Sequence, residues 1–383
     1  MGKTCQIYGT IERIKAASFV NVVYLGGSLT VGTGAGNSAV TSWRRLFSRY
    51  IYERFHPVYH CQPMEVMAGV GAMESYGAVF TVERNVKPYM PVLAFVEFCV
   101  NDNPAQDKAL VKKGMEGIVR QIKSCSTHPD VVIVGAAMRP GYINPEGGIL
   151  DDSLHREIAD YYGLPFIDIQ GYMHRVLEER GQTWDDVSIV FETGDHCHLN
   201  NYGNRLWFEC LREWFEDQWK RDELNPTAVS GSSLPAPMVS DEFQFTKLVD
   251  PAKRNKAIEL EGSWVKKDTA LVPWYMDNLL VGQTGDKLTF TFTGTAIGAM
   301  CMVHCNGLKL IAKLDGRDIA GPFTHFGMEF GKFFMLKHGM APGEHILELE
   351  VGKPMAKKNK LANCTAEIGY LCVGGVDKLK IKK

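Results

Sequence analysis

The sequence predicts an α/β domain followed by an all-β domain. Residues 20–220 alternate short apolar runs with amphipathic helical patterns. Beyond a stretch rich in Pro, Ser and Gly, the helical pattern stops and short alternating runs separated by turn signals replace it. The length of 383 residues also exceeds what one hydrophobic core usually supports. We therefore expect domains at 1–222 and 242–383, joined by a linker at 223–241.

The apolar runs of the first domain indicate strands buried on both faces, because they are short and almost free of polar residues. The clearest helical pattern between them places Val111, Met115, Ile118 and Ile122 on one face. Strands that alternate with helices predict a parallel sheet covered on both sides. The expected strands are 21–27, 64–70, 92–100, 131–137 and 165–169, and the expected helices are 40–55, 76–86, 105–123, 151–162 and 201–220.

The second domain shows the period-two alternation of antiparallel strands, most clearly in KLTFTFTG at 287–294. Turn signals recur between the runs, at Asn306-Gly307, Asp315-Gly316 and Pro342-Gly343. This pattern predicts an all-β sandwich. The expected strands are 243–249, 257–260, 288–293, 296–303, 308–314, 333–337, 345–351 and 366–373.

The composition excludes several classes of protein. Apolar residues make up 45% of the chain and charged residues 22%, which is typical of a soluble globular protein. A net charge of −2 argues against a nucleic-acid surface, and no uncharged apolar run is long enough to span a membrane. The N-terminal segment lacks the apolar core of a secretory signal, and the ten cysteines are scattered. We expect a cytoplasmic protein with no nucleic-acid and no membrane partner.

Ser28 directly follows the first apolar run and two glycines, Gly26 and Gly27. Glycines permit a tight strand-to-helix turn, and parallel α/β sheets bind ligands at the carboxyl ends of their strands. A serine in that position suits a nucleophile, although a capping serine in a glycine-rich turn has the same local pattern. The glycines at 32–36 also suggest a phosphate loop, but the spacing and the lysine of such a loop are missing.

Three further residues carry the parts that acyl transfer needs. Asn101 ends the third apolar run, where its side chain is placed to donate to an oxyanion. Taken in isolation, an Asn-Asp pair is more typical of an Asx turn at a strand end. Asp195 precedes His198 by three residues. That spacing lets the carboxylate accept a hydrogen bond from Nδ1–H while Nε2 faces the serine.

The segment His196-Cys197-His198 also suggests a metal site. However, the two histidines are only two residues apart, and no second Cys or His cluster with ligand spacing lies nearby. Zinc is therefore the weaker interpretation, and we expect neither a metal nor another cofactor.

Four segments, in this order, resemble the sequence blocks of the GDSL/SGNH hydrolase family. They are GGSL at 26–29, MAGVGAMES at 67–75, FCVND at 98–102 and DHCHLN at 195–200. The chain departs from the family pattern at Gly27, where Asp is common, at Cys99, where Gly is usual, and at Leu199, where Pro is frequent.

This resemblance covers roughly residues 20–220 and implies a three-layer α/β/α fold similar to flavodoxin. It also implies esterase chemistry without a metal, with Ser28 as the nucleophile, His198 as the base and then the acid, and Asp195 as the group that orients His198. The oxyanion hole that it implies comprises the N–H of Ser28, the backbone at Gly71 or Ala72, and the side chain of Asn101.

The second domain resembles the galactose-binding-like (jelly-roll) sandwiches that accompany some family members. The resemblance depends on FTGTAIG at 292–298, on the Asp315-Gly316 turn and on PGEH at 342–345. Trp264, Trp274 and Tyr275 are candidates to stack on a sugar ring, and packing at a domain interface is the alternative for them.

We therefore expect a carboxylic ester hydrolase that removes O-acyl, chiefly O-acetyl, groups from a small molecule or glycan. Two alternatives stay open: a non-catalytic carbohydrate-binding or biosynthesis scaffold with a degenerate hydrolase fold, and a thioesterase or lipid esterase. Arg139 is a candidate substrate contact, with a structural ion pair as its alternative. Assembly into a homo-oligomer is also left open by the sequence.

Overall fold

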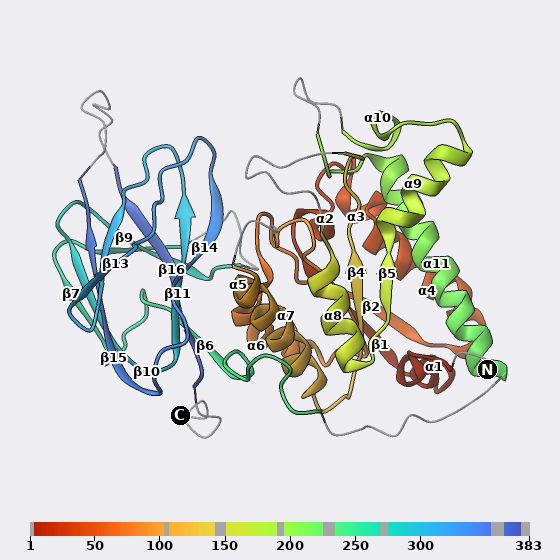
Figure 1. Cartoon of the computed structure of the whole chain (residues 1–383), viewed down its shortest axis with the longest axis horizontal. Coiled ribbons are helices and arrows are strands. Elements are labelled where there is room, and N and C mark those ends of the chain that lie inside the picture. Colours follow the sequence, from red (N-terminus) through yellow and green to blue (C-terminus); the bar gives the residue numbers. More distant parts are fainter. Residues whose placement is uncertain are drawn as a thin grey trace. The chain divides into compact units, whose positions relative to one another are not determined.

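The computed structural model describes residues 4–102, 107–141, 151–189, 195–224, 234–268, 275–353 and 364–376 (Figure 1). The chain divides into two compact units. The first comprises Met1–Ala78 and Val82–Ser240, and the second comprises Val79–Thr81 and Asp241–Lys383.

The first unit contains a five-stranded, all-parallel sheet in the order β2-β1-β3-β4-β5. All residues of β3 are buried, as are all but one of β1, which explains why their sequences read as continuous apolar runs. The chain reverses its winding direction between the neighbouring strands β1 and β3. Ligands of such sheets bind beyond the carboxyl ends of the strands at this point of reversal. The strands are β1 (Phe19–Gly26), β2 (Gln62–Met67), β3 (Leu93–Glu97), β4 (Asp130–Gly135) and β5 (Phe166–Asp168).

Helices cover both faces of this sheet, so the predicted three-layer α/β/α fold is confirmed (Figure 1). One face is covered by α1 (Tyr8–Lys15), α4 (Trp43–Tyr59), α9 (Ile169–Glu179) and α11 (Asn201–Leu224), whose apolar residues share one core cluster with Tyr24 and Phe95. The other face is covered by α5 (Ser75–Ala78), α6 (Val82–Asn85), α7 (Lys108–Lys123) and α8 (Ser153–Tyr162). The remaining short helices are α2 (Ser28–Val31), α3 (Ser38–Thr41), η2 (Lys87–Tyr89) and α10 (Trp184–Val187).

Several element boundaries differ from the sequence-based expectation. The helix expected at 76–86 is split into α5, the 3₁₀ turn η1 (Val79–Thr81) and α6. The helix expected at 105–123 begins at Lys108, because the Asp107 side chain accepts hydrogen bonds from the first free N–H groups. Helices α1 and α9 were not predicted. Asp168 is the last residue of β5. Its side chain caps α9 by accepting a hydrogen bond from Gly171 N.

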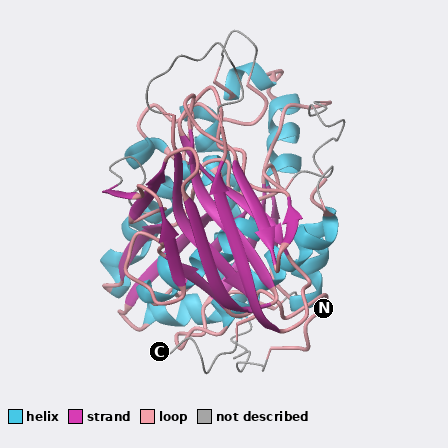
Figure 2. Ribbon diagram, turned by 90° about the vertical axis from the view of Figure 1, so that its left-hand side faces the viewer, coloured by secondary structure: helices cyan, strands magenta, loops and turns pink. Residues whose placement is uncertain are grey.

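The second unit is an antiparallel β-sandwich, as predicted (Figure 2). The Asp315-Gly316 turn has φ of 51° and 74°, the left-handed conformation that a two-residue hairpin requires. One sheet has the order β13-β12-β15-β10-β7 and the other β14-β11-β16-β9-β8, with β6 also paired to β16. The strands are β6 (Thr246–Val249), β7 (Ile258–Glu261), β8 (Val265–Asp268), β9 (Asn278–Gly282), β10 (Lys287–Gly294), β11 (Ala296–Val303), β12 (Leu310–Leu314), β13 (Arg317–Ile319), β14 (Phe330–Lys337), β15 (Gly343–Val351) and β16 (Ala366–Gly374).

Two motifs that the sequence analysis singled out in the second unit meet in space. His345 Nδ1 lies 2.8 Å from Asp315 Oδ2, and Asp315 Oδ1 accepts a hydrogen bond from Ile346 N. These contacts fix the hairpin turn to β15. Of the three candidates to stack on a sugar ring, Tyr275 is fully buried and so cannot stack on an exposed sugar. Trp274 lies outside the described residues. Trp264 is half-buried, with its indole N–H donating to Lys287 O.

Within the linker expected at 223–241, residues 223 and 224 belong to α11, and residues 234–240 pack on the first unit. The buried carboxylate of Glu116 on α7 accepts hydrogen bonds from the N–H groups of Met238, Val239 and Ser240. Arg120, one turn further along α7, donates to Pro235 O. This segment is therefore held in place by side chains of α7.

No helix in the described part of the chain is long and apolar enough to cross a membrane.

Candidate active site

Ser28 is the first residue of α2 and lies directly beyond the carboxyl end of β1. The turn that carries it depends on two glycines. A Cβ on Gly26 would lie 2.2 Å from Thr30 Oγ1 and 2.5 Å from Glu97 O, so no larger residue fits. The N–H of Gly27 donates to Glu97 O, which fixes the turn to the end of β3.

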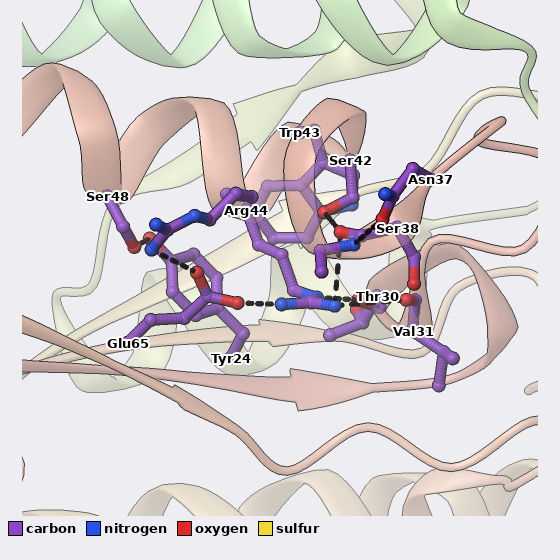
Figure 3. Close-up of polar contacts among 12 residues, drawn as sticks. Tyr24, Thr30, Val31, Asn37, Ser38, Ser42, Trp43, Arg44, Ser48 and Glu65 are labelled. Atoms are coloured by element: carbon purple, nitrogen blue, oxygen red, sulfur yellow. Dashed lines mark hydrogen bonds and ion pairs between the residues drawn. The ribbon is translucent and has the colours of Figure 1, made fainter.

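Helix α2 is a single turn, and side chains of α4 donate hydrogen bonds to its last carbonyls. The indole N–H of Trp43 donates to Leu29 O. The guanidinium of Arg44 donates to Thr30 O and Val31 O (Figure 3). Helix ends leave such carbonyls without partners, and a buried end needs a donor. Side chains of α4 therefore hold the backbone that carries Ser28.

The Arg44 guanidinium is itself buried and paired with Glu65 on β2 (Figure 3). Burial lowers the pKa of Arg44, yet an arginine keeps its charge at physiological pH. A charge in this position needs the carboxylate as a partner, because an unpaired buried ion is strongly destabilising. Arg44 thus links β2, α2 and α4.

Ser28, His198 and Asp195 form a continuous chain of hydrogen bonds. Ser28 Oγ lies 2.8 Å from His198 Nε2, and His198 Nδ1 lies 2.8 Å from Asp195 Oδ2. The other carboxylate oxygen, Oδ1, accepts from the backbone N–H groups of Cys197 and His198. One carboxylate therefore orients both the imidazole and the loop that carries it.

The electrostatics of the pair favour a charged imidazole beside a charged carboxylate. Burial by itself would raise the pKa of Asp195, but the hydrogen bonds from His198 and from the two N–H groups outweigh it and lower the pKa to about 2. Burial by itself would lower the pKa of His198, and the hydrogen bonds with Asp195 and Cys197 reverse this and raise it. The site therefore stabilises the imidazolium that forms when the ring accepts a proton.

The residues expected to bind an oxyanion lie against the Ser28 turn. A Cβ built on Gly71 would be 4.0 Å from Ser28 Cβ, so this glycine borders the serine. Ala72, which follows it, has a φ of 57°, unusual for a residue with a side chain. On the other side, a Cβ on Gly27 would lie 1.9 Å from Asn101 Oδ1. The Asn101 carboxamide therefore lies over Gly27.

This contact gives a physical reason for Gly27 in this chain. An aspartate at position 27 would overlap the Asn101 carboxamide as it lies here. The departure from the family pattern is therefore compensated locally, since the space of the missing side chain is filled by Asn101.

A buried network behind the site was missed by the sequence analysis. Asp102, beside Asn101, accepts a hydrogen bond from Ser75 N at 2.8 Å, and its other oxygen lies 2.9 Å from His155 Nε2. Ser75 closes the segment that begins with Gly71 and Ala72. Asp102 thus ties together the two segments on either side of Ser28. The pKa of His155 is raised, because its neighbours Cys99 and Asp102 outweigh the effect of burial.

The sequence analysis also missed Glu97, a second buried carboxyl near Ser28. It is the last residue of β3, only 1% exposed, and accepts a hydrogen bond from Thr30 Oγ1 at 3.0 Å. Burial raises the pKa of its carboxyl to about 7, although the Thr30 hydrogen bond acts in the opposite direction. A glutamate inside an otherwise apolar strand was the available sequence signal for a functional position.

The other candidates have structural roles. The guanidinium of Arg139 forms an ion pair with Asp185, and the backbone N–H of Arg139 donates to His196 O. Both contacts match the structural alternative for this residue. Residues 142–150 of the loop beyond it lie outside the described part. The glycines at 32–36 pack on the segment around Leu199 and Asn201, where the N–H of Gly36 donates to Asn201 Oδ1.

Comparisons with known proteins identify the fold of the chain and the family that residues 24–206 match. Residues 24–206 match the model of the GDSL-like Lipase/Acylhydrolase family. The crystal structure of a two-domain esterase, CEX, active on acetylated mannans superposes with a TM-score of 0.81 at 17% identity, covering 98% of this chain and 96% of that chain. A structure of CEX co-crystallized with mannopentaose gives 0.80 at 16%, covering 97% and 95%. No curated protein sequence is significantly similar to the chain. The likeness to CEX establishes the two-domain fold.

Proposed function

Residues 24–206 form a GDSL-like lipase/acylhydrolase domain, and on this premise we propose that the protein is a serine esterase that removes O-acetyl groups from a carbohydrate. The observation that carries the proposal is the hydrogen-bonded sequence Ser28 Oγ, His198 Nε2, His198 Nδ1 and Asp195 Oδ2, with both links at 2.8 Å. This geometry matches what a serine nucleophile, a base and an orienting carboxylate require.

In the proposed first step, Ser28 Oγ attacks the ester carbonyl and its proton passes to His198 Nε2. Asp195 stabilises the imidazolium, and the negative charge moves to the carbonyl oxygen. The N–H groups of Ser28 and of Gly71 or Ala72, with the Asn101 carboxamide, are proposed to donate to that oxyanion. The ester C–O bond then breaks, and the leaving alcohol takes the proton from Nε2.

In the second step, water attacks the acyl-serine and gives its proton to His198 Nε2. The second tetrahedral intermediate uses the same oxyanion donors. Its collapse releases the carboxylic acid and returns the proton to Ser28 Oγ, so the enzyme ends in its starting state. Apart from the substrate and this water, the two steps use only residues of this chain.

The carbohydrate part of the proposal has separate support. CEX, which shares the two-domain fold, is active on acetylated mannans. Among glycan esters, we therefore propose an acetylated polysaccharide or oligosaccharide as the substrate of this chain.

The first test is hydrolysis of 4-nitrophenyl acetate and butyrate by wild type, Ser28→Ala and a control, Ser38→Ala. We expect turnover that favours acetate in wild type and Ser38→Ala, and background rates in Ser28→Ala. Labelling with a fluorophosphonate probe checks the nucleophile independently of the substrate. A protein that neither hydrolyses the esters nor reacts with the probe would be the binding or scaffold protein left open by the sequence.

The second test compares acetate release from acetylated mannan and acetylated xylan, with a long-chain acyl ester and an acyl thioester beside them. Release of acetate from a glycan supports the proposed substrate class. A preference for the long-chain ester or the thioester would replace it with the lipid esterase or thioesterase alternative.

A further inference from the structure

Cys197 lies between Asp195 and His198 in sequence and beside them in space. One ligand atom from each of the three residues lies within 4.8 Å of the other two. All three residues are partly exposed, and the Cys197 thiol is not part of a disulfide. Within the described residues, this is the one group of His, Cys, Asp and Glu side chains that meets such a distance criterion.

The donor set suits zinc in particular. A thiolate sulfur, an imidazole nitrogen and a carboxylate oxygen are the ligands that Zn²⁺ prefers, at about 2.0–2.3 Å from the metal. Ligand atoms bound tetrahedrally at such distances are separated by roughly 3–4 Å. The three ligand atoms already lie within 4.8 Å of one another, and Oδ2 and Nδ1, which are 2.8 Å apart, need only a small separation to admit a cation.

The loop is already organised for this arrangement. Asp195 Oδ1 accepts hydrogen bonds from the N–H groups of Cys197 and His198, at 2.9 and 2.6 Å. These bonds close a tight turn, and they leave Oδ2 beside His198 Nδ1 at 2.8 Å. Preorganised ligands lose less entropy when a cation binds.

We propose that Asp195, Cys197 and His198 form a reversible inhibitory site for Zn²⁺. The inference rests on the proposed function, in which His198 must accept a proton from Ser28. The cation takes the place of the proton between Asp195 Oδ2 and His198 Nδ1 and also binds Cys197 Sγ. The imidazole stays neutral, because its proton moves from Nδ1 to Nε2. The thiol proton is released to solvent, and no electron is transferred.

Zinc bound in this way stops the reaction without touching Ser28. With zinc on Nδ1, the imidazole proton occupies Nε2, which then has no lone pair to accept the serine proton. The carboxylate, engaged by the metal, no longer stabilises an imidazolium. With three protein ligands, the fourth position is left to water.

The binding arm of the test is calorimetric titration of the EDTA-treated full chain with ZnCl₂. We expect one Zn²⁺ per chain, and affinity weakened at least about tenfold in Cys197→Ser, because a hydroxyl is a poor substitute for a thiolate. The matched control is Cys305→Ser, which removes an exposed cysteine outside the group and is expected to bind as wild type. Absence of stoichiometric binding, or equal affinity in Cys197→Ser, would overturn the site.

The inhibition arm measures the rate of fluorophosphonate labelling at Ser28 against free Zn²⁺, each variant relative to its own zinc-free rate. We expect labelling to fall with a midpoint equal to the calorimetric Kd, to recover on adding EDTA, and to shift at least about tenfold in Cys197→Ser. Binding without slower labelling would overturn the inhibitory role. If zinc-free enzyme is not labelled at all while Cys197-dependent binding persists, the proposed function fails and the metal site stands.

Discussion

At the scale of single residues, the site depends on a few side chains that are positioned by steric contacts and hydrogen bonds with their neighbours. Gly27 leaves space that the Asn101 carboxamide fills, and Gly71 borders the Cβ of Ser28. Asp195 uses both oxygens, one for the imidazole and one for the loop. The chemistry assigned to each residue is therefore sensitive to changes of a single group.

Asn101→Ala tests the proposed oxyanion donor. Loss of one such donor typically costs on the order of 10²–10³ in rate, so we expect kcat on 4-nitrophenyl acetate to fall by about that factor with KM little changed. Fluorophosphonate labelling of Ser28 should persist at a reduced rate. A wild-type kcat in this variant would remove Asn101 from the mechanism.

Glu97→Gln tests the buried carboxyl behind the turn that carries Ser28. The raised pKa of about 7 means that the folded state holds a proton that the unfolded state, with a usual pKa near 4.5, has lost. The stability of the first unit should therefore decline as pH rises from about 4.5 to 7 and then level off.

The glutamine variant carries no such proton, so its stability should stay flat over this range. Relative to wild type it should gain up to about 3 kcal/mol between pH 5 and 8, at ~1.4 kcal/mol per pKa unit. Hydrogen exchange of the β1 and β3 amides at several pH values measures this. Parallel pH profiles for the two proteins would show that Glu97 does not titrate in this range.

At the scale of secondary-structure elements, the turn that carries Ser28 is held mainly by its neighbours. Helix α2 is too short to stabilise itself, since a single turn cannot repay its nucleation cost. Side chains of α4 donate to its last carbonyls, including the guanidinium of Arg44 to Thr30 O (Figure 3). The end of β3 accepts a hydrogen bond from the N–H of Gly27. The position of Ser28 is thus a property of three elements together.

Arg44→Met tests this support, with Arg45→Met as its matched control. Arg44 has an 8% exposed side chain, whereas Arg45 is 49% exposed and lies 3.6 Å from the same Glu65. Removing one partner of a buried ion pair typically costs about 3–5 kcal/mol, so Arg44→Met should lower the unfolding free energy of the first unit by that amount and also reduce kcat.

Arg45→Met should change stability by less than about 1 kcal/mol, as exposed ion pairs do. Adding Glu65→Met to Arg44→Met should recover part of the loss, because no unpaired charge is then buried. Urea unfolding followed by hydrogen exchange in β1 and β2 provides the measurement. Equal losses in the two single variants would contradict the special role of Arg44.

At the scale of the whole molecule, the chain consists of two units with separate cores. The second unit includes a segment from far away in the sequence, Val79–Thr81. Within that unit the ring of Phe80 lies 5.4 Å from Phe243 and 5.5 Å from Phe333, measured between ring centroids. The units are therefore not two simple consecutive stretches of chain.

Phe80→Ala tests this assignment. A buried Phe→Ala change costs about 3–5 kcal/mol, and we expect hydrogen-exchange protection to fall in β6, β14 and β16 while β1, β3 and β4 keep theirs. Phe95→Ala, in the core of the first unit, should give the reverse pattern. Loss of protection confined to the parallel sheet in Phe80→Ala would place this residue in the first unit.

The sequence by itself determined the two fold classes, most strands and the order of the blocks that carry the chemistry. These follow from local signals: strands buried on both faces must be continuously apolar, sandwich strands must alternate, and a glycine-rich turn must follow β1. It also supplied Ser28, Asn101, Asp195 and His198 as candidates, because each lies in a short block whose residue types can be recognised locally.

Only the tertiary structure decided what supports and adjusts those residues. Arg44, Glu97, Asp102 and His155 act on segments distant in sequence, and a charged residue on an apolar face does not reveal its partner. The split of the helix expected at 76–86 likewise follows from packing that lies outside any local window. Hydrogen bonds and ion pairs across elements depend on three-dimensional proximity, and periodicity along one chain does not encode that.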